Sequence, residues 1–91
     1  MKITIKGKEI ELVNTMRTMI MYENITEKTF APESVTDIII YMYCVVLASS
    51  KDYSLTLDDF IEYIDENPDI FEQFSTWLTD VAKSNGILKK N

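Results

Sequence analysis

The stretch Ser34–Ala48, SVTDIIIYMYCVVLA, decides the fold because it ends in eleven consecutive apolar residues. Five of these eleven are β-branched, so a buried strand is one interpretation. The length favours a helix, since most strands end after about five or six residues. Ser34 and Asp37 also have the spacing of a capping box. A helix that is apolar nearly all round is normally enclosed by other elements, and this one is shorter than the ~18 apolar residues of a membrane span. We therefore predict a central helix that the flanking segments wrap.

The composition indicates one small domain. A chain of 91 residues can build one modest core, so we expect residues 1–86 to form a single globular domain and residues 87–91 a short C-terminal tail. Cys44 is the only cysteine and lies inside the apolar helix, where a small buried hydrophobe is the expected role. The N-terminus lacks the apolar segment of a signal peptide, which predicts a cytoplasmic location.

Negative charge is concentrated in one half of the chain. The net charge is −6, and nine acidic residues but no basic ones lie between Asp52 and Asp80. Binding to nucleic-acid phosphates or to anionic membranes requires a basic face, so we expect neither partner. Solubility is the simplest role for these carboxylates.

Residues 2–13 alternate between apolar and polar side chains around a turn. Gly7 followed by Lys8 suits the central positions of a type II′ turn. This turn would put Lys6 beside Glu9. It would also gather four apolar residues on one face, with Ile5 paired to Ile10 and Ile3 paired to Leu12. The pattern predicts a β-hairpin that packs its apolar face on helices.

The segment between the hairpin and the central helix predicts one short helix and a connection. Asn14 can cap a helix over residues 15–23. The expected apolar stripe is Met16, Met19 and Ile20, with Glu23 one turn further on. Residues 24–32 have no clear period and are expected to connect to the central helix, with Phe30 as an anchor in the core.

Two further helices are predicted after a polar loop over residues 49–54. Thr56 and Asp59 form a second capping box, and Leu55 with Phe60 has the spacing of a hydrophobic staple. The expected apolar stripe is Leu57, Phe60, Ile61 and Ile64. Pro68 is expected at the first position of the last helix, which Gly86 would end. The apolar face of that helix comprises Ile70, Phe71, Phe74, Trp77, Leu78 and Val81.

Histidine, the side chain that most often carries acid–base catalysis, is missing from the chain. Without histidine, nucleophile–histidine pairs and histidine metal sites are excluded, and two glycines cannot build a phosphate-binding loop. Asp65, Asn67 and Asp69 match the first ligand positions of a calcium loop, but Ile70 and Thr76 replace the glycine and the glutamate that such a loop needs. Acidic pairs at four-residue spacing lie opposite the apolar stripe, which is typical of a solvated face. We expect no catalysis, no metal and no cofactor.

Binding to a protein partner is the remaining class of function. Methionine side chains adapt to variable partners, and an exposed Met or aromatic patch marks an interaction site. The candidate contact residues are Met16, Met19, Met21, Tyr22, Tyr41, Met42 and Tyr43. The alternative interpretation is that the methionines fill gaps in the core.

The order of these segments resembles the phage tail assembly chaperone family. The residues that carry the resemblance are the hairpin KITIKGKEIEL at 2–12, the segment MIMYENITEKTF at 19–30, the apolar helix at 38–47 and the segment LTLDDF at 55–60. The residue-level match is Glu23 followed by Thr26-x-Lys28, and Glu27 stands where the family's turn has glycine.

The resemblance implies a non-catalytic protein, encoded by a phage or prophage and located in the host cytoplasm. It would bind the tape-measure protein, keep it soluble during tail assembly, and could also meet the tail-tube protein. The predicted fold is α+β, an N-terminal two-stranded β-hairpin packed on about four helices. Two alternative functions stay open, an acidic inhibitor that mimics DNA and a generic small intracellular adaptor. Whether the chain forms a homo-oligomer is a separate open point.

Overall fold

The computed structural model describes residues 1–28, 34–52 and 54–85. Strands β1 (Lys2–Ile5) and β2 (Lys8–Glu11) form an antiparallel hairpin. The helices of the described residues are α1 (Met16–Thr26), α2 (Val35–Ser50), α3 (Leu57–Glu66) and α4 (Asp69–Asn85). The predicted α+β class, a hairpin followed by four helices, is confirmed. The predictions for Phe30, Gly86 and the tail at 87–91 lie outside the described residues.

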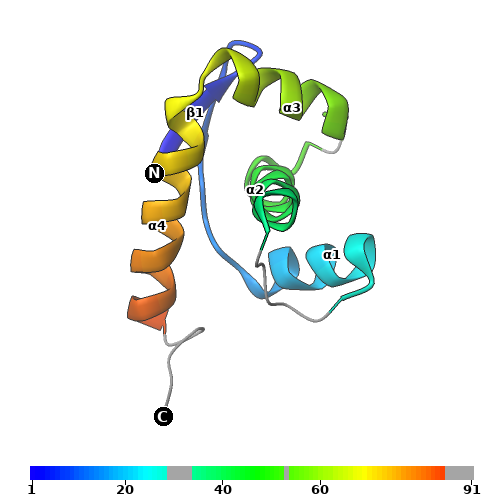
Figure 1. Ribbon diagram of the computed structural model, residues 1–91, viewed down its shortest axis with the longest axis vertical. Helices are drawn as coiled ribbons and strands as arrows, with labels where there is room; N and C mark the ends of the chain where they lie inside the picture. Colours follow the sequence, from blue (N-terminus) through cyan, green and yellow to red (C-terminus); the bar gives the residue numbers. More distant parts are fainter. Residues whose placement is uncertain (29–33, 53, 86–91) are drawn as a thin grey trace.

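Helix α2 is the centre of the fold, as predicted. Figure 1 shows it end-on, with α1, α3, α4 and the hairpin arranged around it. The Ser34 hydroxyl accepts a hydrogen bond from the Asp37 amide at 3.1 Å, which confirms the N-cap. Every residue from Asp37 to Ser50 is buried or half-buried. The helix ends at Ser50 and is followed by Lys51 in the left-handed conformation. It therefore includes Ser49 and Ser50, in contrast to the polar loop predicted over residues 49–54.

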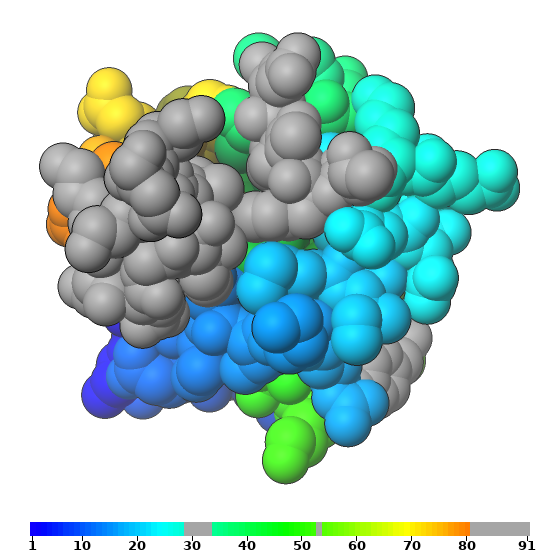
Figure 2. Space-filling view, turned by 90° about the horizontal axis from the view of Figure 1, so that it is seen from below, coloured from blue at the N-terminus to red at the C-terminus, as the bar shows by residue number. Residues whose placement is uncertain are grey.

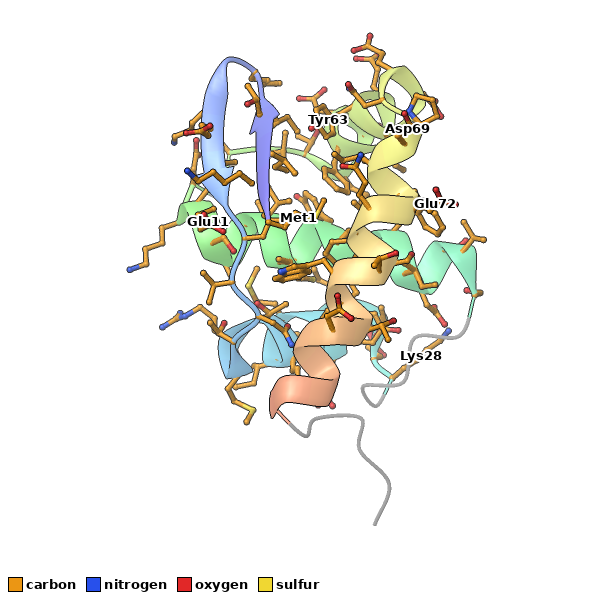
Figure 3. All side chains as sticks on the ribbon, turned by 90° about the vertical axis from the view of Figure 1, so that its left-hand side faces the viewer. Met1, Glu11, Lys28, Tyr63, Asp69 and Glu72 are labelled. Atoms are coloured by element: carbon orange, nitrogen blue, oxygen red, sulfur yellow. The ribbon has the colours of Figure 1, made fainter. Side chains whose placement is uncertain are left out.

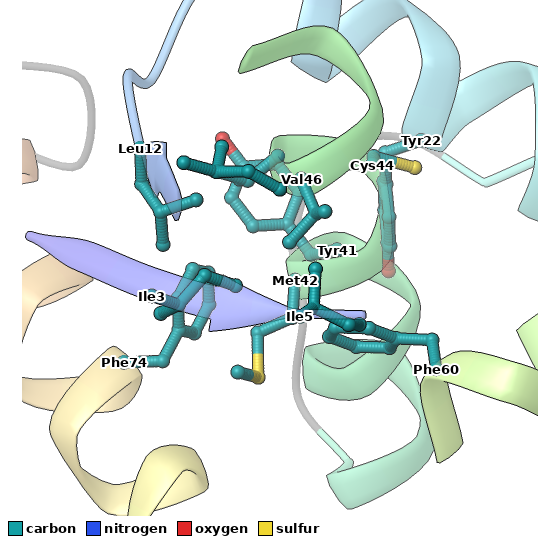
Figure 4. Close-up of a cluster of buried hydrophobic side chains, with 12 residues drawn as sticks. Ile3, Ile5, Leu12, Tyr22, Tyr41, Met42, Cys44, Val46, Phe60 and Phe74 are labelled. Carbon is teal, nitrogen blue, oxygen red and sulfur yellow. The ribbon is translucent and has the colours of Figure 1, made fainter. Parts of the chain in front are cut away.

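Aromatic rings join α2 to three other helices. Figure 4 shows four of these rings, those of Tyr22, Tyr41, Phe60 and Phe74. Tyr41 on α2 meets Tyr22 on α1 edge-on, with ring centroids 5.6 Å apart, and Phe74 on α4 at 6.5 Å. The ring centroid of Tyr43, also on α2, lies 5.8 Å from that of Phe60 on α3. Such ring pairs stabilise a fold beyond the area that they bury.

The hairpin forms with the predicted face but with a different register. The central turn residues are Lys6 and Gly7, not Gly7 and Lys8, and both have positive φ angles of 52° and 75°. This makes the turn type I′, whose twist matches that of the flanking strands. The observed pairs are Lys2 with Glu11, Ile3 with Ile10, Thr4 with Glu9 and Ile5 with Lys8. The partners shift by two residues, so the same apolar side chains still face the core.

Charged groups at both ends of the hairpin agree with the observed register. The Met1 ammonium lies 3.1 Å from the Glu11 carboxylate at the open end (Figure 3), and the Leu12 amide donates to the Met1 carbonyl oxygen. At the turn, Lys6 donates to Asp59 on α3 rather than lying beside Glu9 as predicted.

Helices α3 and α4 follow their sequence patterns closely. The Thr56 hydroxyl accepts from the Asp59 amide at 3.1 Å, and Phe60 is fully buried, as the capping box and staple predict. Ile61 is the exception in the stripe, since it is 39% exposed. Helix α4 begins at Asp69, one residue after Pro68. Five residues of its predicted face pack on or in the core: Ile70, Phe71, Phe74, Trp77 and Leu78, of which Phe74 is fully buried.

Candidate partner-binding surface

Helix α1 presents apolar residues on two opposite faces. Thr18 and Tyr22 are fully buried against the rest of the protein, whereas Met16 is 66% exposed and Ile20 is 54% exposed. Met16 and Ile20 are four residues apart and therefore neighbours on the helix surface. Val13, just before the helix, is 49% exposed. We call Val13, Met16 and Ile20 the outer α1 face; Figure 2 looks onto α1 from this side.

The orientation of α1 is the opposite of the one that its apolar stripe indicates. If the predicted apolar stripe were the buried face, Met16 and Ile20 would lie against the core, yet the side of α1 that carries Thr18 and Tyr22 packs on α2. A buried tyrosine ring removes a large area from water, about 150–250 Å² for an aromatic side chain. The Thr18 hydroxyl is also paired with Thr15 at 3.2 Å, so its burial leaves no unpaired polar group.

Hydrogen bonds from α2 hold the segment before α1 in place. The Val13 amide donates to the Ser49 hydroxyl at 2.8 Å, and the Asn14 side chain accepts from the Tyr41 hydroxyl. Thr15, not Asn14 as predicted, caps the helix by accepting from the Thr18 amide. With its backbone tied to α2 in this way, Val13 leaves its side chain on the surface.

The C-terminal end of α1 extends three residues beyond the predicted Glu23. Thr26 donates its hydroxyl to the Tyr22 carbonyl, and Glu27 follows in the left-handed conformation. Lys28 then lies 3.2 Å from Asp37 in the first turn of α2, which joins the two helices.

The seven predicted contact residues divide into three groups. Met16 alone is exposed, whereas Met19, Met21 and Tyr43 are half-buried. Tyr22, Tyr41 and Met42 are core residues and are at most 1% exposed, so they cannot contact a partner in this fold. Sequence reasoning missed Val13 and assigned Ile20 to the apolar stripe. One signal in the sequence could have identified Val13 and Ile20, because the segment around α1 contains more apolar residues than one buried helix face can hold.

Burial raises the pKa values of two ionisable side chains on α2, which keeps them in their neutral and less reactive forms. Burial raises the pKa of the Cys44 thiol to about 11, so the thiol stays protonated near neutral pH. Burial also raises the pKa of Tyr41, whose hydroxyl is held by Asn14. These groups behave as parts of the core.

Two surface hollows near the hairpin contain charges that are already paired. The first, about 130 Å³, lies between the hairpin and the α2–α3 connection, where Lys8 is 3.5 Å from Asp52. The second, about 260 Å³, is lined by Lys6 and Asp59, which are 2.8 Å apart. The hydrogen bond that Lys6 donates to Asp59 lowers the pKa of Asp59 and raises the pKa of Lys6. Both groups therefore stay ionised near neutral pH, which does not favour proton transfer.

The described residues contain no group of three or more metal-ligating side chains and no helix with the length and hydropathy of a transmembrane segment. No family model, curated protein or solved structure matches the chain. The candidate function therefore depends on the residues and their geometry.

Proposed function

We propose that this chain is a tail assembly chaperone of a phage or prophage, a non-catalytic protein that binds the tape-measure protein. The outer α1 face is the proposed contact surface. It supports the proposal because Met16 and Ile20 form an exposed apolar row, while other residues of the same helix, Thr18 and Tyr22, already make its contact with the core. An exposed row at four-residue spacing fits the apolar side of a partner helix. In the host cytoplasm this contact would keep the tape-measure protein soluble.

The charge of the body agrees with this role. The side chains of α3 and α4 carry seven exposed carboxylates that make no ion pair with the described residues: Asp58, Glu62, Asp65, Glu66, Asp69, Glu72 and Asp80. Charge of this kind keeps a protein soluble. A complex that hides an apolar helix at α1 would still present this acidic surface to water.

The direct test is co-expression with the tape-measure protein of the same locus. We expect the wild-type chain to increase the soluble fraction of that protein and to co-purify with it. The double variant Met16→Glu/Ile20→Glu should lose both effects because it places carboxylates in the apolar contact. Val35→Glu is the matched control, since Val35 is 62% exposed on another helix.

The variants also separate lost binding from lost folding. Because the substituted residues are exposed, each variant should keep the wild-type free energy of unfolding within about 0.5 kcal/mol per substitution. A wild-type chain that neither solubilises nor retains the tape-measure protein would disprove the proposal.

The exposed carboxylates of α3 and α4 favour a second candidate, an inhibitor that mimics DNA. Binding to a DNA-binding protein would then weaken steeply as salt increases. The double variant Met16→Glu/Ile20→Glu would leave that affinity unchanged. Charge-reversing substitutions such as Glu62→Lys/Glu66→Lys should abolish it. If these substitutions instead leave tape-measure binding intact while the α1 variant removes it, the chaperone proposal is supported over the mimic.

A further inference from the structure

The charges of α1 oppose its own helix dipole. Arg17 lies in the first turn and Glu27 caps the C-terminal end, while no acidic residue lies in the first turn and no basic residue in the last. A helix is stabilised by the reverse arrangement, acids at its N-terminus and bases at its C-terminus. Arg17 and Glu27 therefore do not serve the stability of α1. Such local conflicts are expected where a surface has another use.

Arg17 and Glu27 lie at opposite ends of α1. Both side chains are exposed and make no ion pair with the described part of the chain. Arg17 lies on α1 three residues before Ile20, at the flank of the apolar row, and Glu27 follows directly after the last helical residue. The ten positions from Arg17 to Glu27 correspond to about 15 Å along the axis. Helix α1 thus has a positive charge near one end and a negative charge at the other.

We propose that the outer α1 face binds an amphipathic helix of ordinary charge polarity and that this helix runs parallel to α1. Such a helix has acids in its first turn and bases in its last. In the parallel orientation its acids meet Arg17 and its bases meet Glu27. In the antiparallel orientation like charges would oppose each other at both ends. The inference depends on the proposed docking at α1 but not on which protein supplies the helix.

Two synthetic peptides of identical composition test this orientation. Both carry the same central apolar stripe and differ only in their charged ends, one with acids first and bases last, the other reversed. We expect the first to bind about five-fold more tightly at low salt, the size expected of two exposed ion pairs. The preference should disappear in ~1 M salt, where charges are screened within a few ångström.

Exchanging the charges on α1 should exchange the preference. Arg17→Glu/Glu27→Lys is expected to bind the reversed peptide more tightly, at unchanged net charge. Lys8→Glu/Glu72→Lys, an exchange next to the hairpin turn and on α4, should leave the original preference intact. A preference that survives the α1 exchange would overturn the inference.

A spin label gives the orientation directly. With a nitroxide on the N-terminus of the first peptide, the amide resonances of Met16 and Arg17 should broaden more than those of Ile25 and Thr26. Stronger broadening at Ile25 and Thr26 would overturn the parallel orientation. Equal affinity for both peptides at low salt would also overturn it while leaving docking at α1 standing. If neither peptide binds, the docking proposal itself fails.

Discussion

Glu27 has the backbone conformation that glycine usually supplies at the end of a helix. Its φ and ψ angles are 58° and 29°, and its amide donates to the Glu23 carbonyl at 2.7 Å. The left-handed geometry is therefore present although the residue type differs. A side chain costs about 1 kcal/mol in this conformation relative to glycine.

Glu27→Gly should consequently raise the free energy of unfolding by about 1 kcal/mol. The measurement is urea denaturation of the variant beside the wild type. Lys51→Gly is the matched comparison, because Lys51 ends α2 with nearly the same angles, 58° and 25°. If Glu27→Gly lowers stability while Lys51→Gly raises it, the side chain of Glu27 contributes more than the backbone strain costs.

Cys44 should make stability depend on pH under alkaline conditions. Its pKa is about 11 in the folded protein, against 9.0 for an ordinary thiol. Between these values the unfolded thiol ionises and the folded one does not, so the free energy of unfolding falls as pH rises. Cys44→Ala should lose less stability from pH 9 to 11 than the wild type, by up to about 2–3 kcal/mol.

The comparison of slopes removes the effect of the small cavity in Cys44→Ala. That cavity lowers stability at every pH, whereas ionisation changes only the alkaline part of the curve. Tyr41, whose pKa is also raised, is present in both proteins and cancels. Parallel curves for the two proteins over this range would contradict a protonated, buried thiol.

At the scale of elements, helices with a cap and a single apolar stripe were predictable. Ser34 and Thr56 each accept from the amide three residues on, as their spacing predicts. The register of the hairpin was not predictable, because Gly7 suits a type I′ turn at its second central position as well as a type II′ turn at its first. Both turns put the same side chains on the core face.

The orientation of α1 could not be decided from its periodicity. Met16 and Ile20 indicate one core face, while Tyr22 indicates another almost opposite. The contact between Tyr22 and Tyr41 decides between them, and this contact joins residues 19 positions apart in the chain. The periodicity of a single helix does not indicate a contact between residues this far apart in the sequence. Met16 and Ile20, which this pattern would place in the core, are also the residues that we assign to the partner contact.

Phe74 is the residue through which α4 is expected to contribute most to stability. It is fully buried, and its ring centroid lies 5.5 Å from that of Trp77 and 6.5 Å from that of Tyr41. Phe74→Ala should lower the free energy of unfolding by about 3–5 kcal/mol, measured by urea denaturation. Ile61→Ala, at a residue that is 39% exposed, should cost about 1 kcal/mol or less.

A marginally stable chain could unfold completely with alanine at position 74. Phe74→Leu keeps most of the volume and should cost about 1–2 kcal/mol, which stays measurable. Equal losses for the substitutions at Phe74 and Ile61 would show that α4 is not packed on the core as described.

For the whole molecule, the arrangement around α2 explains why a partner surface remains. The hairpin and three helices enclose α2, and they bury both of its tyrosines at least in part. One side of helix α1 covers α2, and the opposite side carries exposed apolar residues. The proposed chaperone therefore binds its partner on a helix that covers the core, and binding does not require the core to open.

Methionine oxidation, followed by mass spectrometry in the free chain and in its complex with the tape-measure protein, tests this central claim most directly. Met16 is 66% exposed and Met42 is 1% exposed, and oxidation follows exposure. We predict that Met16 is oxidised rapidly in the free chain and protected in the complex, while Met42 reacts slowly in both. Rapid oxidation of Met16 within a stable complex, or of Met42 in the free chain, would contradict the account.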